Sequence, residues 1–452
     1  MLALDVVAHG IGGVQDLPVP RWLFYWGAAI ALVVSFLLLG ALWRSPVLAR
    51  RSRGQPLVST ARLQPLAVLL QLVSVALFAL VWAAALLGDT DPFSNVAPTW
   101  VYIAFWLGLP LLSVVLGDVW RVLSPWRAIA DGAVWLLERT GRRAKPLSAY
   151  PTRLGRWPAA ATLAGFTILE LAYSEPSSPR ALAFAIALYT YVALFGMVAF
   201  GREAWTRSGE GFSVGFSLLA RLAPLYVDEG ALRARWPFSG LATGERVPGS
   251  TAVVGVMLGS VMFDGYSRTT TWQDLLSELE APYLIDRPGV AELLVTAASV
   301  GGLLAAFVLV SLAFRAACAV AGLLVRAPRD LAPDFLLSLV PIAFAYLVAH
   351  YFSLFAVQGQ FLIPLLSDPF GQGRDLLGTA GFKPNLVPFS PTTIWYVQAS
   401  ALVTGHVIGL AVAHDRAVAI FAERRVALRS QLPMLALMLL YTVGGLWILS
   451  RP

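Results

Sequence analysis

This chain of 452 residues contains ten long apolar segments. Polar connections, most of them rich in arginine, separate them. A helix that crosses a bilayer needs about 20 mostly apolar residues, so a chain of this length has room for roughly ten such helices. The composition points to the same class, because 58% of the residues are hydrophobic and 13% are charged, whereas soluble domains average about 45–50% and about 25%. The sequence therefore predicts an all-α, polytopic integral membrane protein of the cytoplasmic membrane, with one membrane domain in contact with the lipid bilayer. The predicted spans are 22–43, 63–87, 99–117, 157–173, 181–200, 250–264, 290–314, 334–356, 392–413 and 432–449.

The positions of the basic residues predict how the chain is oriented. If the N-terminus lies outside, most of the 33 lysines and arginines fall in connections assigned to the cytoplasm. Short cytoplasmic loops are enriched in these residues, so we expect about ten spans with both termini outside. The same layout predicts an external arm at 1–21, a cytoplasmic interfacial helix and loop at 118–156, a cytoplasmic polar segment at 201–249 and an external loop at 357–391.

Each of the two regions assigned to the cytoplasm contains an apolar stretch, but neither stretch is long enough to cross the membrane. In the first region, Trp120, Trp126 and Trp135 alternate with arginines. This pattern suits a helix in the cytoplasmic interface with its indoles at the depth of the lipid headgroups. In the second region, the apolar core at 212–226 predicts an interfacial or re-entrant helix.

Missing motifs argue against several protein classes. Cys318 is the only cysteine, so the chain has no disulfide of its own, no cysteine-based zinc site and no iron–sulfur cluster. The sequence contains no Walker-type phosphate loop, no GxSxG nucleophile elbow and no HExxH motif, which argues against ATP-driven transport, a lipase-like hydrolase and a zincin. The formal charge of +7 is explained by arginines in loops, and no nucleic-acid motif accompanies it. We therefore expect no nucleic-acid partner.

Three of the four histidines lie between residues 350 and 416, in two apolar segments. An ionisable side chain inside a bilayer costs several kcal/mol unless it is paired, ligated or hydrated, so these histidines are functional candidates. The predicted topology places His350 in the outer half of the membrane, His406 near its middle and His414 at the cytoplasmic surface. His406 and His414 are candidates for binding a cofactor such as haem. The alternative is that each neutral imidazole hydrogen-bonds a neighbouring helix.

A site open to the outer face is predicted, with His9, Asp264, His350 and Asp368 as candidate metal ligands. Of these, Asp264 and His350 are the candidate catalytic residues. Imidazole and carboxylate groups suit a divalent transition metal such as zinc, iron or copper, and a metal with an open position can activate water for hydrolysis. In the alternative interpretation, Asp264 pairs with Arg268 and His350 packs between helices. His9 is then a surface residue, and Asp368 forms a turn.

Several segments resemble those of a known family. They are His9 to Gly13 with Asp16 to Pro20, Gly117 to Trp120, Phe263 to Gly265, Ser367 to Gly371, and Gly405 and His406 with Ala413 to Arg416. In these segments, which extend over nearly the whole chain, the protein resembles a group of actinobacterial multi-pass membrane proteins often labelled fenitrothion hydrolase. The resemblance implies a membrane-bound enzyme that cleaves an aryl phosphorothioate triester, a hydrophobic small-molecule substrate. It assigns no catalytic residue.

The sequence thus supports one leading functional hypothesis and two alternatives. The leading hypothesis is a membrane-bound hydrolase of organophosphorus esters that uses a metal ion at an outward-facing pocket. In the first alternative, the protein is a transporter or accessory protein that handles a metal ion or haem. In the second, it is a scaffold subunit without chemistry of its own that works with a partner membrane subunit.

The predicted orientation can be tested by labelling single cysteines. A cysteine at Ser94 should react with a membrane-impermeant thiol reagent added outside, because the connection after the second span is predicted to be external. A cysteine at Ser52, in the preceding arginine-rich connection, should react only after the membrane is permeabilised. Cys318 is replaced by serine in both variants so that one thiol is present. Reversed labelling would invert the predicted depth of every histidine.

Overall fold

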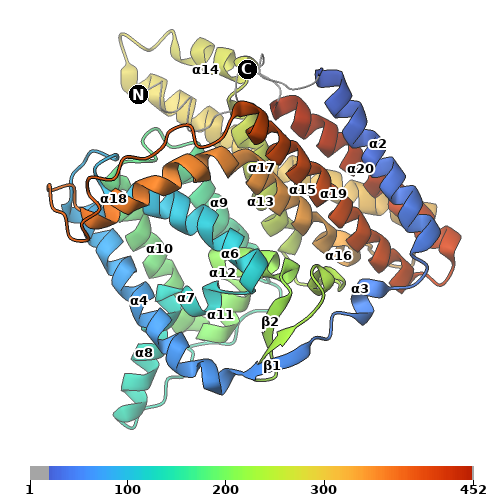
Figure 1. Cartoon of the computed structure of the whole chain (residues 1–452), viewed down its shortest axis with the longest axis horizontal. Coiled ribbons are helices and arrows are strands. Elements are labelled where there is room, and N and C mark those ends of the chain that lie inside the picture. Colours follow the sequence, from blue (N-terminus) through green and yellow to red (C-terminus); the bar gives the residue numbers. More distant parts are fainter. Residues whose placement is uncertain (1–19, 450–452) are drawn as a thin grey trace.

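The fold is a bundle of long helices with a small sheet at one end (Figure 1). The computed structural model describes residues 20–449, and 72% of the structure is helical. Within the described residues, eight helices are long and apolar enough to cross a membrane. The protein is therefore an all-α polytopic membrane protein, as the sequence predicts.

The eight candidate spans include two runs in which short helical elements follow one another directly. The spans are α2 (Arg21–Leu42), α4 (Thr60–Leu87), the run of α5 (Val96–Thr99), the π-helix η2 (Trp100–Gly108) and α6 (Leu109–Leu116), α10 (Pro179–Phe200), α15 (Pro288–Leu324), the run of α16 (Ala332–Phe335), η5 (Leu336–Leu339), α17 (Val340–Gln358), η6 (Gly359–Phe361) and α18 (Leu362–Ser367), α19 (Pro391–Ile420) and α20 (Arg424–Leu449). The other helices are α3 (Val47–Arg50), α7 (Trp120–Leu123), α8 (Pro125–Arg139), α9 (Trp157–Leu171), α11 (Arg202–Ser208), α12 (Gly211–Leu219), η3 (Ala220–Leu222), η4 (Ser239–Leu241), α13 (Ser250–Ser267) and α14 (Thr270–Glu280).

Each predicted span coincides with a helix. The spans predicted at 157–173 and 250–264 correspond to α9 and α13, which are not among the eight: α9 has only 15 residues, and α13 includes Asp264 and several other polar residues. The number of spans and the positions of the termini therefore stay predictions. One boundary differs from the prediction. The external loop expected from residue 357 begins only after Ser367, because further apolar residues extend the helical run through η6 and α18.

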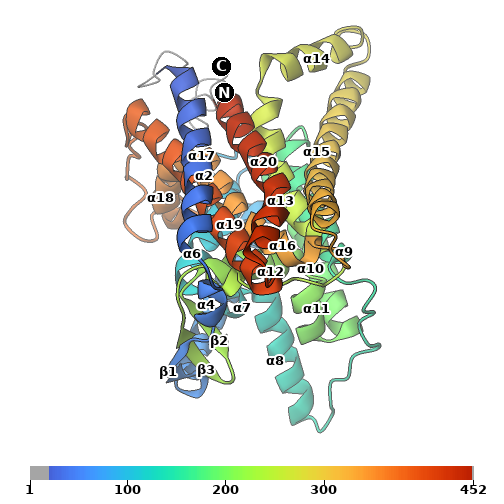
Figure 2. The same ribbon diagram turned by 90° about the vertical axis from the view of Figure 1, so that its right-hand side faces the viewer.

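A three-stranded antiparallel sheet adds an element that the helical prediction did not include. Its strands are β1 (Gln55–Ser59), β2 (Leu225–Asp228) and β3 (Ala231–Ala234), in the order β1-β3-β2. β1 pairs with β3, so the connection that follows α3 is joined to the segment that follows α12. Figure 2 shows the sheet and α8 at the end of the molecule opposite α14. The two joined connections are both ones that the sequence assigns to the cytoplasm.

Aromatic side chains hold α7, α8 and α12 together. Trp120 and Trp126 are 3% and 6% exposed, and their rings lie 5.8 and 6.4 Å from those of Phe216 and Phe212 in α12. These two indoles are therefore covered by the protein and do not face lipid, because α12 gives them an apolar partner inside the bundle. Trp135, in contrast, is 55% exposed. Most of α12 is buried inside the protein, and whether the helix is interfacial or re-entrant stays a prediction.

Glycine residues allow α17 and α19 to pack closely. A Cβ atom added at Gly405 would lie 2.2 Å from the Cβ of Ala345 and 2.9 Å from the carbonyl oxygen of Pro341. Gly409, one turn further along α19, is crowded in the same way. Small residues let membrane helices approach at such distances. This contact positions α17, which carries His350.

Replacing Gly405 by alanine should destabilise the protein. The added methyl group would force α17 and α19 apart, and overpacking of this kind costs about 1–3 kcal/mol. The free energy of unfolding, measured by thermal or denaturant unfolding in detergent, should fall by that amount. Gly301→Ala is the matched control, since a Cβ atom there meets nothing within 4 Å. Equal stability of the two variants would contradict the close packing of α17 on α19.

Candidate functional site

The predicted site residues Asp264 and His350 meet in the structure. Asp264 lies near the end of α13 and is 2% exposed, whereas His350 lies in the middle of α17. The Nε2 atom of His350 and the Oδ2 atom of Asp264 are 2.8 Å apart, which is a hydrogen-bond distance. The predicted topology placed the two residues on one side of the membrane without showing that their helices are neighbours. The packing of α13 against α17 brings them into contact.

Two further side chains donate to the carboxylate of Asp264. The Tyr351 hydroxyl donates to Oδ2 at 2.8 Å, and the Arg268 guanidinium donates to Oδ1 from Nε and Nη2 at 3.3 and 3.2 Å. We call Asp264, Arg268, His350 and Tyr351 the aspartate cluster. Both oxygens of the buried acid accept hydrogen bonds, as burial of such a group requires. Sequence analysis anticipated Arg268 as a structural partner and missed Tyr351, because a tyrosine in an apolar helix carries no signal of its own.

Asp264 and His350 have the arrangement of an acid–base pair. A carboxylate that accepts from one ring nitrogen orients the imidazole and leaves the other nitrogen free to act as a base. Among the described residues, Nδ1 of His350 has no hydrogen-bond partner. An opening of about 20 Å³, lined also by Tyr346 and Gly445, adjoins the ring and has room for about one water molecule. When Nε2 carries the proton that Asp264 accepts, Nδ1 of His350 can serve as a base.

The proposed metal ligands do not converge in the described part of the chain. No group of three or more histidine, cysteine, aspartate or glutamate side chains comes together there, whereas a catalytic zinc ion has about three protein ligands. Asp264 already faces Arg268, whose positive charge opposes a second cation. His9 lies outside the described residues. Asp368 accepts from two backbone N–H groups of its own loop at 3.0 and 2.6 Å, so it forms a turn, as in the structural alternative.

His406 and His414, the predicted cofactor ligands, are both buried in α19. Nδ1 of His406 lies 2.8 Å from the carbonyl oxygen of Leu402, one turn back, and its Nε2 has no partner among the described residues. The ring nitrogens of His414 lie 3.1 Å from Oε1 of Gln431 and 3.0 Å from the carbonyl oxygen of Trp43. Both side chains are at most 1% exposed, so a haem does not fit against either ring as packed. The contacts they make are those of helix packing.

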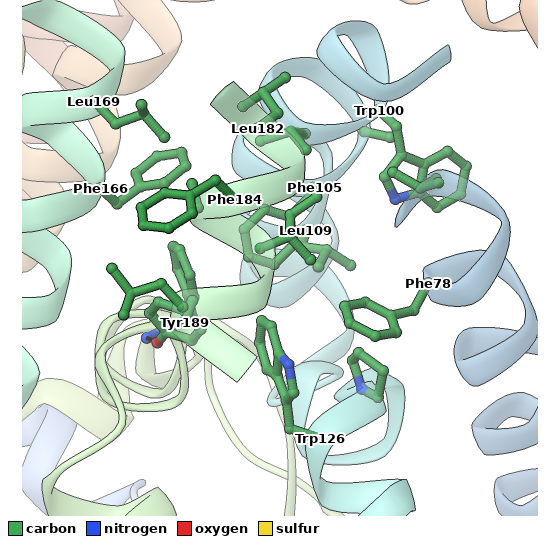
Figure 3. Close-up of a pocket in the computed structure, with 18 of the residues that line it drawn as sticks. Phe78, Trp100, Phe105, Leu109, Trp126, Phe166, Leu169, Leu182, Phe184 and Tyr189 are labelled. Atoms are coloured by element: carbon green, nitrogen blue, oxygen red, sulfur yellow. Dashed lines mark hydrogen bonds between the residues drawn. The ribbon is translucent and has the colours of Figure 1, made fainter. Parts of the chain in front are cut away.

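A much larger cavity, which sequence analysis missed, lies between α4, η2, α6, α9 and α10 (Figure 3). Its volume is about 1130 Å³. Aromatic and aliphatic side chains line most of it, and Figure 3 shows Phe105, Phe166 and Tyr189 around the shared space, from η2, α9 and α10. In a membrane protein such residues are indistinguishable from core or lipid-facing residues by sequence alone. No local pattern could have marked them.

Polar groups line the cavity near the start of α10. Glu175 and Arg180 lie there, and Arg180 donates to the carbonyl oxygens of Ala85 and Gly88 at 2.6 and 3.0 Å. These bonds fasten α10 to the end of α4 and hold the guanidinium group at the rim. Phe184, another lining residue, is 71% exposed, so this wall of the cavity reaches the surface of the helix bundle.

The π-helix η2 separates the large cavity from the aspartate cluster. Phe105 of η2 lines the cavity, whereas Ile103 packs with Tyr351 on the other side. Helix α9 borders both sites, because Leu169 lines the cavity and the helix packs against α13, which carries Asp264. Helical segments with π geometry are frequent at functional sites. The two candidate sites therefore share walls without sharing residues.

Comparisons with known proteins supply no function. The chain matches no family model, no curated protein and no solved structure. The resemblance to the fenitrothion hydrolase group thus stays a prediction, and function has to be inferred from the geometry of the two sites.

Asp264 and His350 should be energetically coupled. Residues in direct contact show interaction energies of about 0.5–3 kcal/mol in a double-mutant cycle. The double variant Asp264→Asn with His350→Gln should therefore lose less unfolding free energy in detergent than the two single variants together. Asp264→Asn with His414→Gln is the control, because His414 bonds to other partners and the losses should add within about 0.5 kcal/mol. Additive losses in the first pair would contradict the contact.

Proposed function

We propose that this protein binds a lipophilic small molecule, drawn from the bilayer, in the cavity between α4, η2, α6, α9 and α10. The proposal rests on the combination of a volume of about 1130 Å³ with a mostly apolar and aromatic lining. Pockets for small-molecule ligands measure about 300–1,000 Å³ and have hydrophobic walls with a few placed polar groups. A cavity slightly larger than this range suits a long or bulky apolar molecule.

The residues near the start of α10 indicate that the ligand is amphipathic. Arg180 is held at the rim by carbonyl oxygens of α4, and Glu175 lies on the same side of the cavity. The lining of α10 continues to Val192, about 18 Å further along the helix at about 1.5 Å per residue. A polar head near Arg180 would therefore leave room for an extended apolar tail between the rings of η2 and α9.

We further propose that α9 and α13 complete a set of ten spans in the cytoplasmic membrane, with both termini outside. The pairing of β1 with β3 supports this layout, because it joins two connections expected on the cytoplasmic side. At the other face, the backbone N–H of Asp89 donates to the carbonyl oxygen of Phe370 at 2.9 Å, which joins two connections expected outside. In this orientation the Arg180 rim lies toward the outer face.

Hydrolysis of an organophosphorus ester is our second candidate function. The acid–base pair of Asp264 and His350, with a water-sized opening beside it, favours it. A general base must lie within about 2.6–3.2 Å of the proton it removes, or act through one water. The described residues that line the large cavity include neither histidine nor aspartate, so a bound ester would have to reach His350 past the wall of η2. We therefore favour binding or translocation over hydrolysis. The handling of a metal or haem has no comparable support in the described residues.

A bulky residue placed in the cavity should block binding without disturbing the fold. Gly165 of α9 lines the cavity, and a Cβ atom there meets nothing within 4 Å, so Gly165→Phe should fill part of the space. The proteins are purified in nanodiscs, and the organic extracts are compared by mass spectrometry. We expect one lipophilic molecule to be enriched over bulk lipid with the wild type, and at least about tenfold less of it with Gly165→Phe.

The control variant is Gly301→Phe, since a Cβ atom at Gly301 is equally free and the residue belongs to α15, outside the cavity lining. It should retain the molecule at the wild-type level. His350→Gln separates the two candidate functions, because it should leave binding unchanged and abolish ester hydrolysis if the second candidate is correct. Equal retention by the wild type and Gly165→Phe, or no enriched molecule in the wild type, would overturn the binding proposal.

A further inference from the structure

Three arginines converge on one buried carboxylate, away from both sites described above. Asp334 lies in α16, and its side chain is fully buried. Arg246, Arg329 and Arg416 place guanidinium nitrogens 3.2, 3.3 and 2.5 Å from its oxygens. The arginines belong to different segments, namely the connection before α13, the connection after α15 and α19. All of these segments lie on the side that the sequence assigns to the cytoplasm.

The group carries more positive charge than its carboxylate can balance. One arginine would neutralise Asp334, so the other two leave a charge excess at the surface. The side chains of Arg246 and Arg329 are 56% and 47% exposed, whereas that of Arg416 is 20% exposed. A guanidinium has more N–H donors than these contacts use. The contact with Asp334 therefore fixes the two exposed arginines and leaves N–H donors of each guanidinium available to solvent.

A second acid beside this group is also paired with more than one arginine. Glu245, which precedes one of the three arginines in the chain, pairs with Arg156 at 3.3 Å and with Arg221 at 2.7 Å. Asp330, the other acid nearby in the chain, pairs with Arg315 at 3.6 Å and so does not offset the excess. Around Asp334 and Glu245, five arginines face two acids within residues 20–449, which leaves three positive charges unbalanced there. An anion is the chemical partner that such a surface lacks.

We propose that Arg246 and Arg329, supported by Arg416 and Asp334, bind a phosphate group. The planar fork of arginine matches the oxygens of phosphate, and the charge-assisted hydrogen bonds are about twice as strong as neutral ones. The buried carboxylate positions the forks before the anion arrives, so less side-chain freedom is lost on binding. Two sources supply this chemistry. One is the headgroup of an anionic phospholipid, which basic pockets between membrane helices bind on the cytoplasmic side, and the other is a phosphate compound in solution.

The test uses the full-length protein in detergent and measures its thermal unfolding. Phosphatidylglycerol in mixed micelles is compared with phosphatidylcholine, and inorganic phosphate is compared with chloride at equal ionic strength. Stabilisation by phosphatidylglycerol alone would identify a lipid headgroup, and stabilisation by inorganic phosphate would identify a soluble ligand. In either case, Arg246→Gln with Arg329→Gln should weaken the apparent affinity at least about tenfold, because both exposed forks are lost.

The control variant, Arg142→Gln with Arg143→Gln, removes the same charge from another exposed stretch of the arginine-rich side and should bind like the wild type. Arg246→Lys with Arg329→Lys keeps the charge without the fork, so it should bind more weakly than the wild type. If the glutamine variant does not fold, the comparison of the lysine variant with the wild type tests the proposal instead. No stabilisation of the wild type by either source, or affinities in the cluster variants equal to that of the wild type, would overturn the proposal.

Discussion

The interior of a bilayer offers no hydrogen-bond partners, and the rest of this structure depends on that constraint. Backbone groups are satisfied inside helices, and polar side chains that enter the bundle have to find partners within it. Asp264 accepts from three side chains of the aspartate cluster. Asp415 of α19 accepts from Nε1 of Trp43 at 2.9 Å and from the backbone N–H groups of Leu48 and Ala49 at 2.9 and 3.0 Å. Both acids bond segments that are distant in the sequence. The primary role of these buried polar groups is therefore to hold the bundle together, and a catalytic role would be additional.

Aromatic packing explains how the bundle keeps a large cavity. The rings of Phe105 and Phe212 meet edge to face with centroids 4.6 Å apart and define one end of the space. Glu210 secures that end, because it accepts from the backbone N–H groups of Phe212 and Ser213 at 3.0 and 2.8 Å and from the hydroxyl of Tyr189. Rings are rigid and have few rotamers. The walls therefore retain their shape where flexible aliphatic chains would fill the gap.

The positions of the helices could be predicted because the bilayer acts on each segment separately. A sufficiently long apolar segment folds into a helix whatever its neighbours are, so every predicted span falls on a helix. The predictions were incomplete where a partner elsewhere in the protein decides the outcome. Trp120 and Trp126 are buried against α12, a contact that their local sequence does not show. β1 has only 5 residues, and its partner β3 lies far along the chain, so the local sequence does not specify the sheet.

The sequence by itself determined the membrane class, the helix positions and the candidacy of Asp264 and His350, because an ionisable residue in an apolar segment stands out from its neighbours. Only the tertiary structure decided that these two side chains touch, that Tyr351 joins them, and that His414 bonds to neighbouring helices. It also decided the existence of the large cavity, whose apolar lining leaves no local pattern. The physical reason is the same in each case. Hydropathy acts between one segment and its solvent, whereas contacts and cavities depend on how several segments lie against one another.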